Sequence, residues 1–327
     1  MKVLVTGSSG RVGSSLVDRL LGDGHMVTGL DARASGRDAK GYTEVAGILD
    51  DPAVAARATK GAEAVLHLGA FMSWAAADKA KMFAANVEGT RVLLDAASEV
   101  GIRRFVFARS GEVYPEHAPL SQPITEDHPL RANSPYGLTK LLGEELVRFH
   151  QRAGRMETTI LRFSHTQNAS ELLDENSFFS GPRFFLEPRI RQQEGFGNMQ
   201  VAEILRAAHP GHPAHILARN ENGRPFRMHI TDTRDMVQGI LLAMTHPAAA
   251  GEVFNLGATD PVDFEPLLGK MAKVTGLPVV TVDLPGAGVF YHTSNTKIRE
   301  KLGFGPQWTI DRMLNEAAAA RASRMMG

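Results

Sequence analysis

The chain opens on Met1-Lys2-Val3-Leu4-Val5-Thr6-Gly7-Ser8-Ser9-Gly10-Arg11-Val12-Gly13, an apolar run followed by three glycines at the spacing GxxGxxG. The first glycine of such a loop permits a tight turn, the second lets the backbone approach a pyrophosphate, and the third lets helix and strand pack closely. A helix beginning here presents free N–H groups and a partial positive charge to phosphates. The segment therefore predicts a dinucleotide-binding strand–loop–helix unit. The residues expected at the cofactor are Gly7, Ser9, Gly10, Arg11 and Val12.

An acidic residue ends the second expected strand, which runs from Met26 to Asp31. A carboxylate at this place can accept hydrogen bonds from both hydroxyls of the adenosine ribose. It would also repel a 2′-phosphate, so NAD is favoured over NADP. Arg11 and Arg33 could instead pair with such a phosphate, but we interpret them as solvated side chains.

Short β-branched runs alternate with amphipathic stretches through the first half of the chain. Further strands are expected at 64–68, 105–108, 158–163 and 253–257. Apolar strands separated by helices are typical of a parallel sheet covered on both faces. We predict an α/β fold: a doubly wound parallel (Rossmann) sheet with a smaller C-terminal substrate-binding region. The expected NAD-binding domain spans 1–165 and is rejoined by about 228–258, and the substrate-binding region comprises 166–227 and 259–327.

Composition narrows the classes of function. Lys plus Arg and Asp plus Glu each number 36 in 327 residues, and this neutral balance argues against a broad nucleic-acid surface. The chain has no cysteine, which excludes disulfides and thiolate metal sites and fits the cytoplasm. No apolar run approaches the roughly 18 residues of a membrane span. We expect a cytoplasmic protein with no metal, nucleic-acid or membrane partner.

Tyr136 and Lys140 stand four residues apart on an expected helix over 134–148, so they share one face. Ser110 follows the strand at 105–108, at the edge where parallel sheets bind ligands. A tyrosine with a pKa of about 10 is a poor base, but a nearby ammonium and an oxidised nicotinamide both favour its phenolate. The phenolate would take a hydroxyl proton while hydride leaves the same carbon, and Ser110 would orient the substrate oxygen. We predict Ser110, Tyr136 and Lys140 as catalytic residues.

Together these motifs resemble the extended short-chain dehydrogenases, the NAD-dependent epimerase/dehydratase family, over about residues 1–310. The segments that add to the likeness are His67-Leu68-Gly69-Ala70, Asn86-Val87-Glu88-Gly89-Thr90, Leu161-Arg162-Phe163 and His229-Ile230-Thr231-Asp232. The resemblance implies tightly held NAD, substrates that are commonly nucleotide sugars, and a homodimer, which this family often forms. The further cofactor contacts that we expect are Ala32, Leu49, Leu68, Gly69, Ala70, Asn86, Ala108 and Phe163.

Several positions depart from the family pattern. His165 replaces an Asn that often lies at the nucleotide-sugar phosphates, and Pro225 replaces an expected Arg. Glu112 fills the base position of the sugar 4,6-dehydratases, but Gly111 lacks the acid that would protonate a departing hydroxyl. Elimination of water by that route is therefore not expected. The residues expected to contact substrate are Ser110, Glu112, His165, Arg183 and Arg227.

We predict an NAD-dependent oxidoreductase or epimerase that acts on a secondary hydroxyl of a sugar or nucleotide sugar. An alternative is a dehydrogenase of a free sugar or sugar acid, which His165 and the displaced arginine favour. A third reading is a non-catalytic NAD-sensing regulator, but such proteins typically lose the Tyr or the Lys. The sequence does not decide between epimerisation and net oxidation, because both begin with the same half-reaction.

Overall fold

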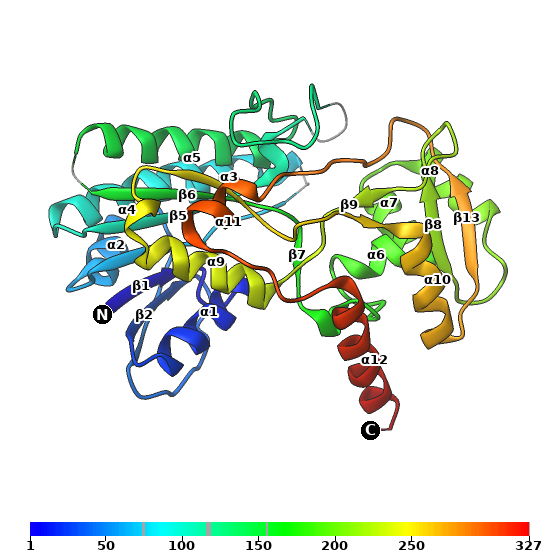
Figure 1. Ribbon diagram of the computed structural model, residues 1–327, viewed down its shortest axis with the longest axis horizontal. Helices are drawn as coiled ribbons and strands as arrows, with labels where there is room; N and C mark the ends of the chain where they lie inside the picture. The colour runs from blue at the N-terminus through cyan, green and yellow to red at the C-terminus, as the bar shows by residue number, and fades with distance from the viewer. Residues whose placement is uncertain (74–75, 116–118, 155, 327) are drawn as a thin grey trace.

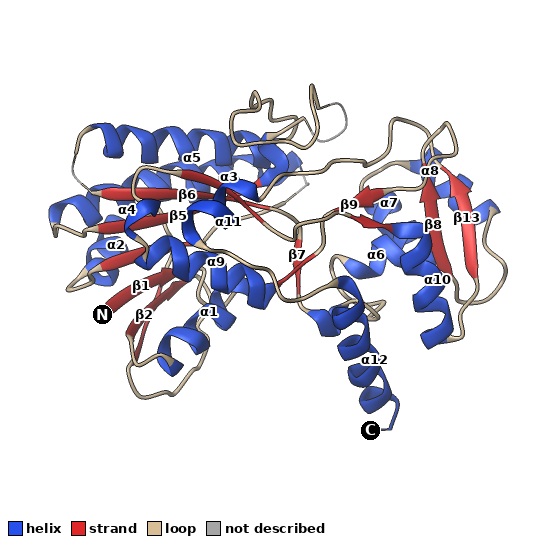
Figure 2. Cartoon of the chain, viewed as in Figure 1, coloured by secondary structure: helices blue, strands red, loops and turns tan. Residues whose placement is uncertain are grey.

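The computed structural model describes residues 1–73, 76–115, 119–154 and 156–326. A seven-stranded sheet in the order β11-β6-β5-β4-β1-β2-β3 forms its centre (Figures 1 and 2). All neighbouring strands of this sheet are parallel. The strands are β1 (Lys2–Thr6), β2 (Met26–Asp31), β3 (Tyr42–Ala46), β4 (Ala64–His67), β5 (Arg104–Ser110), β6 (Glu157–Phe163) and β11 (Val253–Leu256).

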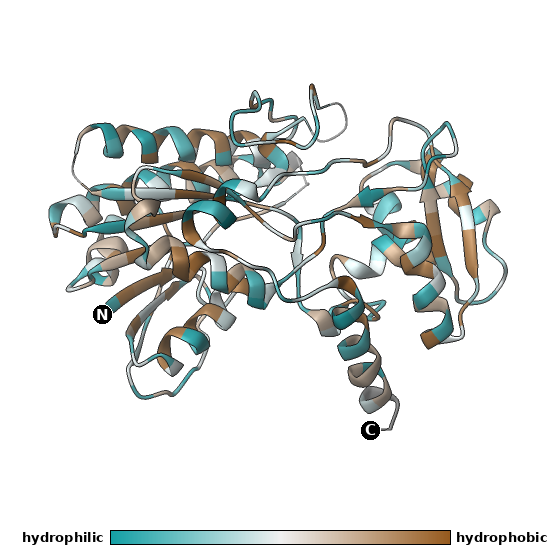
Figure 3. Cartoon of the chain, viewed as in Figure 1, coloured by the Kyte–Doolittle hydropathy of each residue, from teal (hydrophilic) through white to brown (hydrophobic). Residues whose placement is uncertain are grey.

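The strand order reverses between β1 and β4, and this reversal opens a crevice at the carboxyl ends of the two strands. Side chains alternate across β1, so Val3 and Val5 belong to one core layer and Leu4 to the other. Figure 3 shows hydrophobic residues gathered along these central strands. The predicted doubly wound parallel sheet is confirmed.

Helices cover both faces of the sheet. On one face α1 (Arg11–Gly22) packs against α9 (Thr233–Thr245) (Figure 1). The other face carries α2 (Pro52–Thr59), α4 (Gly89–Glu99) and α5 (Pro135–Arg152). Shorter helical turns in this half are η1 (Ala76–Asp78), α3 (Lys79–Phe83), η2 (Ala84–Glu88), η3 (Gly111–Val113) and η5 (Pro247–Ala249).

A second lobe lies beyond the carboxyl edge of the sheet. Its helices are η4 (Ala169–Glu171), α6 (Ser180–Phe184), α7 (Leu186–Gly195), α8 (Met199–Ala207), α10 (Phe264–Thr275) and α12 (Ile310–Met326). It also holds a parallel pair of strands, β8 (His215–Arg219) and β13 (Val279–Asp283). The sequence did not predict this second sheet, because its two strands lie far apart in the chain.

Two short strand pairs join the halves of the molecule: β7 (Thr166–Gln167) with β10 (Thr231–Asp232), and β9 (Arg227–Met228) with β12 (Val262–Asp263). The division of the chain at residue 165 remains our proposal. The last stretch contributes to both halves, because α11 (Thr296–Leu302) packs against β11. Within the described ranges, no helix combines the length and the apolar character needed to cross a membrane.

Candidate active site

The loop between β1 and α1 is shaped by its glycines. Gly7 has a φ of 68°, and a Cβ added there would lie 2.9 Å from the Cα of Gly69. A Cβ on Gly13 would lie 2.0 Å from the carbonyl oxygen of Gly7, so only glycine allows this approach of helix and strand. Gly10 precedes α1 and has no side chain to cap it, so the first N–H groups of the helix can serve a ligand.

Asp31 is fixed against this loop. Its Oδ2 accepts from the Ser9 backbone N–H at 3.0 Å, and its Oδ1 accepts from the Arg33 backbone N–H at 3.0 Å. The Ser9 hydroxyl in turn donates to the carbonyl of Arg33 at 2.9 Å. The carboxylate is therefore oriented by backbone groups, and each of its oxygens keeps a lone pair for a further donor.

Arg11 is not the solvated side chain that we expected. Its guanidinium donates to both carboxylate oxygens of Glu171, with N···O distances of 3.0–3.1 Å, and lies 5.0 Å from the ring centre of Phe179. The pair joins the glycine loop to the second lobe. Arg11 and Glu171 are 160 residues apart, so no local pattern could have shown it.

The start of α5 sets the position of Tyr136. Ser134 caps the helix by accepting from the Gly137 N–H at 2.9 Å, and Pro135 occupies the first turn. Tyr136 and Lys140 lie one turn apart on α5 and line the same cavity as Ser110, the last residue of β5. Burial raises the pKa of the Tyr136 phenol above its usual value. We expected Lys140 and an oxidised nicotinamide together to lower this pKa, and the protein surroundings alone do not supply an acidic phenol.

Lys140 is 4% exposed, and its Nζ lies 4.8 Å from the ring centre of Phe107. Burial, together with the positive charge of Arg109, lowers its pKa to about 7. Asn86 supports this part of α5, because its side-chain N–H₂ donates to Thr139 Oγ1 at 3.0 Å. The Oδ1 of Asn86 also accepts from the backbone N–H of Phe71, and its Nδ2 donates to the carbonyl oxygen of Phe71.

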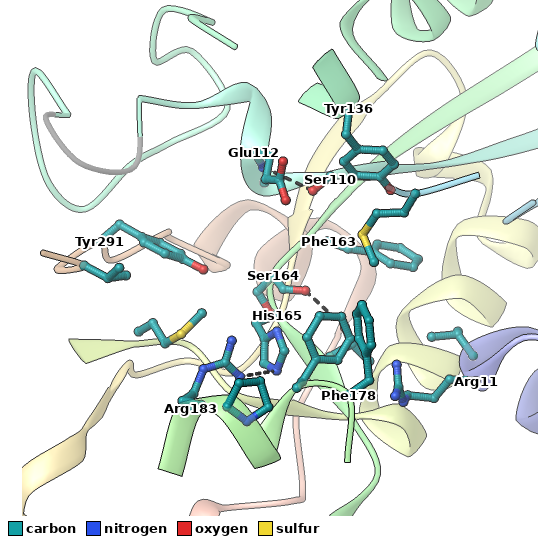
Figure 4. A pocket seen from close by; sticks show the side chains of 18 of the residues that line it. Arg11, Ser110, Glu112, Tyr136, Phe163, Ser164, His165, Phe178, Arg183 and Tyr291 are labelled. Carbon is teal, nitrogen blue, oxygen red and sulfur yellow. Dashed lines mark hydrogen bonds between the residues drawn. The ribbon is translucent and has the colours of Figure 1, made fainter. Parts of the chain in front are cut away.

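One central cavity of about 510 Å³ brings many of the predicted residues together. In Figure 4, Ser110, Glu112 and Tyr136 lie on one side of this cavity, while His165 and Arg183 lie on the opposite side. The predicted residues that line it are Gly7, Gly10, Arg11, Val12, Leu68, Ala108, Ser110, Glu112, Tyr136, Lys140, Phe163, His165 and Arg183.

The other predicted residues lie outside this lining: Ser9, Asp31, Ala32, Leu49, Gly69, Ala70, Asn86 and Arg227. Gly69 lies behind Gly7, and Leu49 packs beside Gly69. Ala32 and Ala70 are exposed. Arg227, for which we predicted a substrate contact, forms an ion pair with Asp263 at 3.1 Å and is not among the residues that line the cavity.

Glu112 and His165 are both half-buried and line this cavity. Burial raises the pKa of Glu112, whose Oε2 accepts from Ser134 Oγ at 2.8 Å. His165 Nε2 lies 2.7 Å from a guanidinium nitrogen of Arg183, and burial and this cation hold the His165 pKa well below its usual range. The imidazole is therefore neutral.

A buried ionic network beside Lys140 was not predicted from the sequence. Arg109 on β5 and Arg162 on β6 are register partners, and both form ion pairs with Glu144 of α5. Arg162 also donates to Tyr114 Oη at 2.7 Å. The spacing of Tyr136, Lys140 and Glu144 on one helix face was the available signal.

An open parallel sheet, a glycine loop after its first strand and a Ser–Tyr–Lys group at its carboxyl edge are the features of the extended short-chain dehydrogenases. The model of the NAD dependent epimerase/dehydratase family matches residues 3–257. The chain belongs to this family.

Two curated relatives illustrate the range of the family. A dTDP-glucose 4,6-dehydratase of Streptomyces griseus is 29% identical over 93% of this chain and 89% of its own length. A UDP-glucose 4-epimerase of Mycolicibacterium smegmatis is 30% identical over 94% of each chain. Among solved structures, a short-chain dehydrogenase/reductase superfamily protein from Agrobacterium tumefaciens with bound NAD is 67% identical, with a TM-score of 0.97 over 99% of this chain and 98% of the other.

Proposed function

We propose that the protein binds NAD and uses Ser110, Tyr136 and Lys140 to oxidise a secondary hydroxyl of a sugar or nucleotide sugar, as an epimerase or a dehydrogenase. The observation that carries this proposal is the single cavity lined by the glycine loop and by all three side chains. The same grouping argues against a regulator that only senses NAD.

The residues present fit NAD. The free N–H groups after Gly10 suit its pyrophosphate, and the fixed carboxylate of Asp31 suits the hydroxyls of its adenosine ribose. Leu68 and Phe163 give the cavity an apolar side suited to the nicotinamide. The 67% identical Agrobacterium tumefaciens protein has bound NAD, which supports the same cofactor here. When bound, NAD supplies the hydride acceptor.

Side chains of the protein position the substrate oxygen and accept the hydroxyl proton. Ser110 donates to the oxygen and orients it, while Tyr136 takes the hydroxyl proton. Because burial raises the pKa of Tyr136, a positive charge nearby is needed to make it a base, and Lys140 supplies that charge in its ammonium form.

Replacement of Tyr136 by Phe tests the mechanism. We expect Tyr136→Phe to lower turnover about 10²–10⁴-fold while NAD binding is kept, because the proton acceptor is lost and the fold is not. NADH absorbance and NMR of the sugar, with UDP-glucose, dTDP-glucose and sugar acids as substrates, provide the readout. Sugar inversion without net NADH identifies an epimerase, and stoichiometric NADH identifies a dehydrogenase. Turnover of Tyr136→Phe at the parent rate would refute the mechanism.

We further propose a homodimer. Three exposed apolar residues, Leu138, Leu142 and Phe149, form a stripe on the outer side of α5. A second copy of the chain would bury this stripe, since large exposed apolar side chains at helical spacing favour a protein contact.

A further inference from the structure

Arg109 is a buried cation that the proposed mechanism does not use. It is 1% exposed and lies on β5, directly before Ser110. Because side chains alternate across a strand, Arg109 points to the same face of the sheet as Phe107. Phe107 packs in the core layer beneath α5, where Val147 of that helix also lies. Arg109 is therefore enclosed between the sheet and α5.

Lys140 is enclosed in the same layer. Its Nζ lies 4.8 Å from the ring centre of Phe107, and a Cβ added to Gly143 would lie 2.8 Å from the Cζ of that ring. One turn beyond Lys140, Glu144 forms an ion pair with Arg109. Two residues that follow each other on one face of β5, Phe107 and Arg109, thus lie beneath two successive turns of α5. The fold therefore brings the cations of Arg109 and Lys140 into one buried layer.

The carboxylate of Glu144 is shared among several guanidinium groups. Besides Arg109, it forms ion pairs with Arg162 of β6 at 2.9 Å and with Arg148 of α5 at 2.8 Å. Even without the partly exposed Arg148, two buried arginines share one carboxylate. Water screens buried charges little, so the layer beneath α5 keeps an excess of positive charge beside Lys140.

The remaining titratable groups around this part of α5 leave that excess in place. His67 of β4 is buried, and burial together with Lys140 lowers its pKa to about 3, so the imidazole is neutral. Glu112 of η3 acts on Tyr136, whose pKa is raised by burial and by this carboxylate. The charged residues of α3, η2 and α4 are exposed or pair with one another: Lys79, Lys81, Glu88, Arg91, Asp95 and Glu99.

We infer that Arg109 is a positioning residue for the proposed proton transfer, because its charge drives one proton from the pair of Tyr136 and Lys140 near neutral pH. The inference rests on the proposed function. Neighbouring titratable groups lose their protons as a pair, and a buried cation beside them favours loss of the first proton whichever group releases it. That proton goes to the solvent, and the singly deprotonated pair can then accept the hydroxyl proton of the substrate. The pKa of Lys140, lowered to about 7 by burial and by Arg109, agrees with this role.

The experiment compares the pH dependence of the parent with that of variants at Arg109. Arg109→Gln and Arg109→Met remove the charge, and Arg109→Lys keeps it. Arg104→Gln, which removes a second buried arginine at the other end of β5, is the control. Each protein is labelled with ¹³C at the lysine Cε, loaded with NAD and titrated by NMR, and the Lys140 signal is assigned by its loss in Lys140→Met. The kcat is measured over the same pH range with the best of the sugars tested for the proposed function.

We expect Arg109→Gln and Arg109→Met to move the Lys140 titration midpoint, and the acid limb of kcat, upward by about 1–3 pH units. Arg109→Lys and Arg104→Gln should leave both in place. At about pH 6 the two neutral variants should therefore turn over about 10-fold or more slowly than the parent, and a higher pH should restore their rates.

A purely structural role of Arg109 gives a different result. The neutral variants would then be slow at every pH with the Lys140 midpoint of the parent, and the inference would be overturned. A parent midpoint at about 10.4, the value of an ordinary lysine, overturns it without any variant. Failure of the proposed function is seen separately, as a parent that turns over none of the sugars.

Discussion

Lys140 lies in surroundings that are unusual for a lysine, because its side chain is buried. It is enclosed beneath Phe107, and Arg109 lies close enough to disfavour its positive charge. The buried network of Arg109, Arg162 and Glu144 lies one turn further along α5. Burial places the Lys140 ammonium beside the proposed base, and the same burial raises the free energy of its charged form.

This cost predicts a pH dependence of stability. The pKa of Lys140 is about 7 when folded and about 10.4 when unfolded, so between these values the unfolded chain binds more protons. The free energy of unfolding therefore rises with pH across that window. Lys140→Met should stabilise the protein at about pH 6, and the gain should shrink at about pH 9, in urea unfolding.

Lys60→Met, at an exposed position, is the matched control for loss of a charge. Lys140→Met should also lower turnover, since the phenol of Tyr136 loses its cation. A gain in the free energy of unfolding that is equal at both pH values would contradict the lowered pKa of Lys140.

At the scale of an element, the crossing of β1 and α1 depends on Gly13. A Cβ at this position would meet backbone atoms of Gly7, which cannot move aside as a side chain can. We expect Gly13→Ala to lower the free energy of unfolding by about 1–3 kcal/mol, as overpacking does, and to weaken NAD binding. Urea unfolding and NAD titration measure the two effects.

Gly22, at the other end of α1, is the control. A Cβ there meets no atom within 4 Å, so Gly22→Ala should be neutral or stabilising by up to about 1 kcal/mol. Equal effects of the two substitutions would show that helix propensity, and not the close approach, governs α1.

At the scale of the whole molecule, α5 links the site to the proposed homodimer. Phe149 is 58% exposed and Leu142 is 37% exposed on the outer side of the same helix that holds Lys140. We expect the double variant Leu142→Glu, Phe149→Glu to sediment as a 35.4 kDa monomer and the parent at twice that mass. Val274→Glu, exposed on α10, is the control. A parent that sediments as a monomer contradicts the dimer.

The sequence predicted those parts of the molecule that have a local signature. Asp31 and Gly13 follow from the spacing of one strand–loop–helix unit, and Tyr136 and Lys140 follow from the spacing on one helix. The strand β3 was missed because it is a sheet edge with little burial, so its apolar residues do not form a run.

The ion pairs of the arginines and the pKa of Tyr136 could not be predicted in the same way. Arg189 and Arg227 look alike in the sequence, and only the fold shows that Arg227 pairs with Asp263 while Arg189 forms no ion pair with any described residue. Likewise, the pKa of Tyr136 depends on how completely the folded chain encloses it, which residue spacing does not report.

The pair of Arg11 and Glu171 has a consequence for any redesign of the protein. Arg11 starts the helix that follows the glycines, while Glu171 and Phe179 come from the second lobe. The ion pair of Arg11 and Glu171 thus connects the two halves of the molecule beside the central cavity, which Arg11 lines. A redesign of the second lobe for a different substrate must keep an acid at position 171, because Arg11 otherwise loses its ion pair and the end of the glycine loop loses its connection to that lobe.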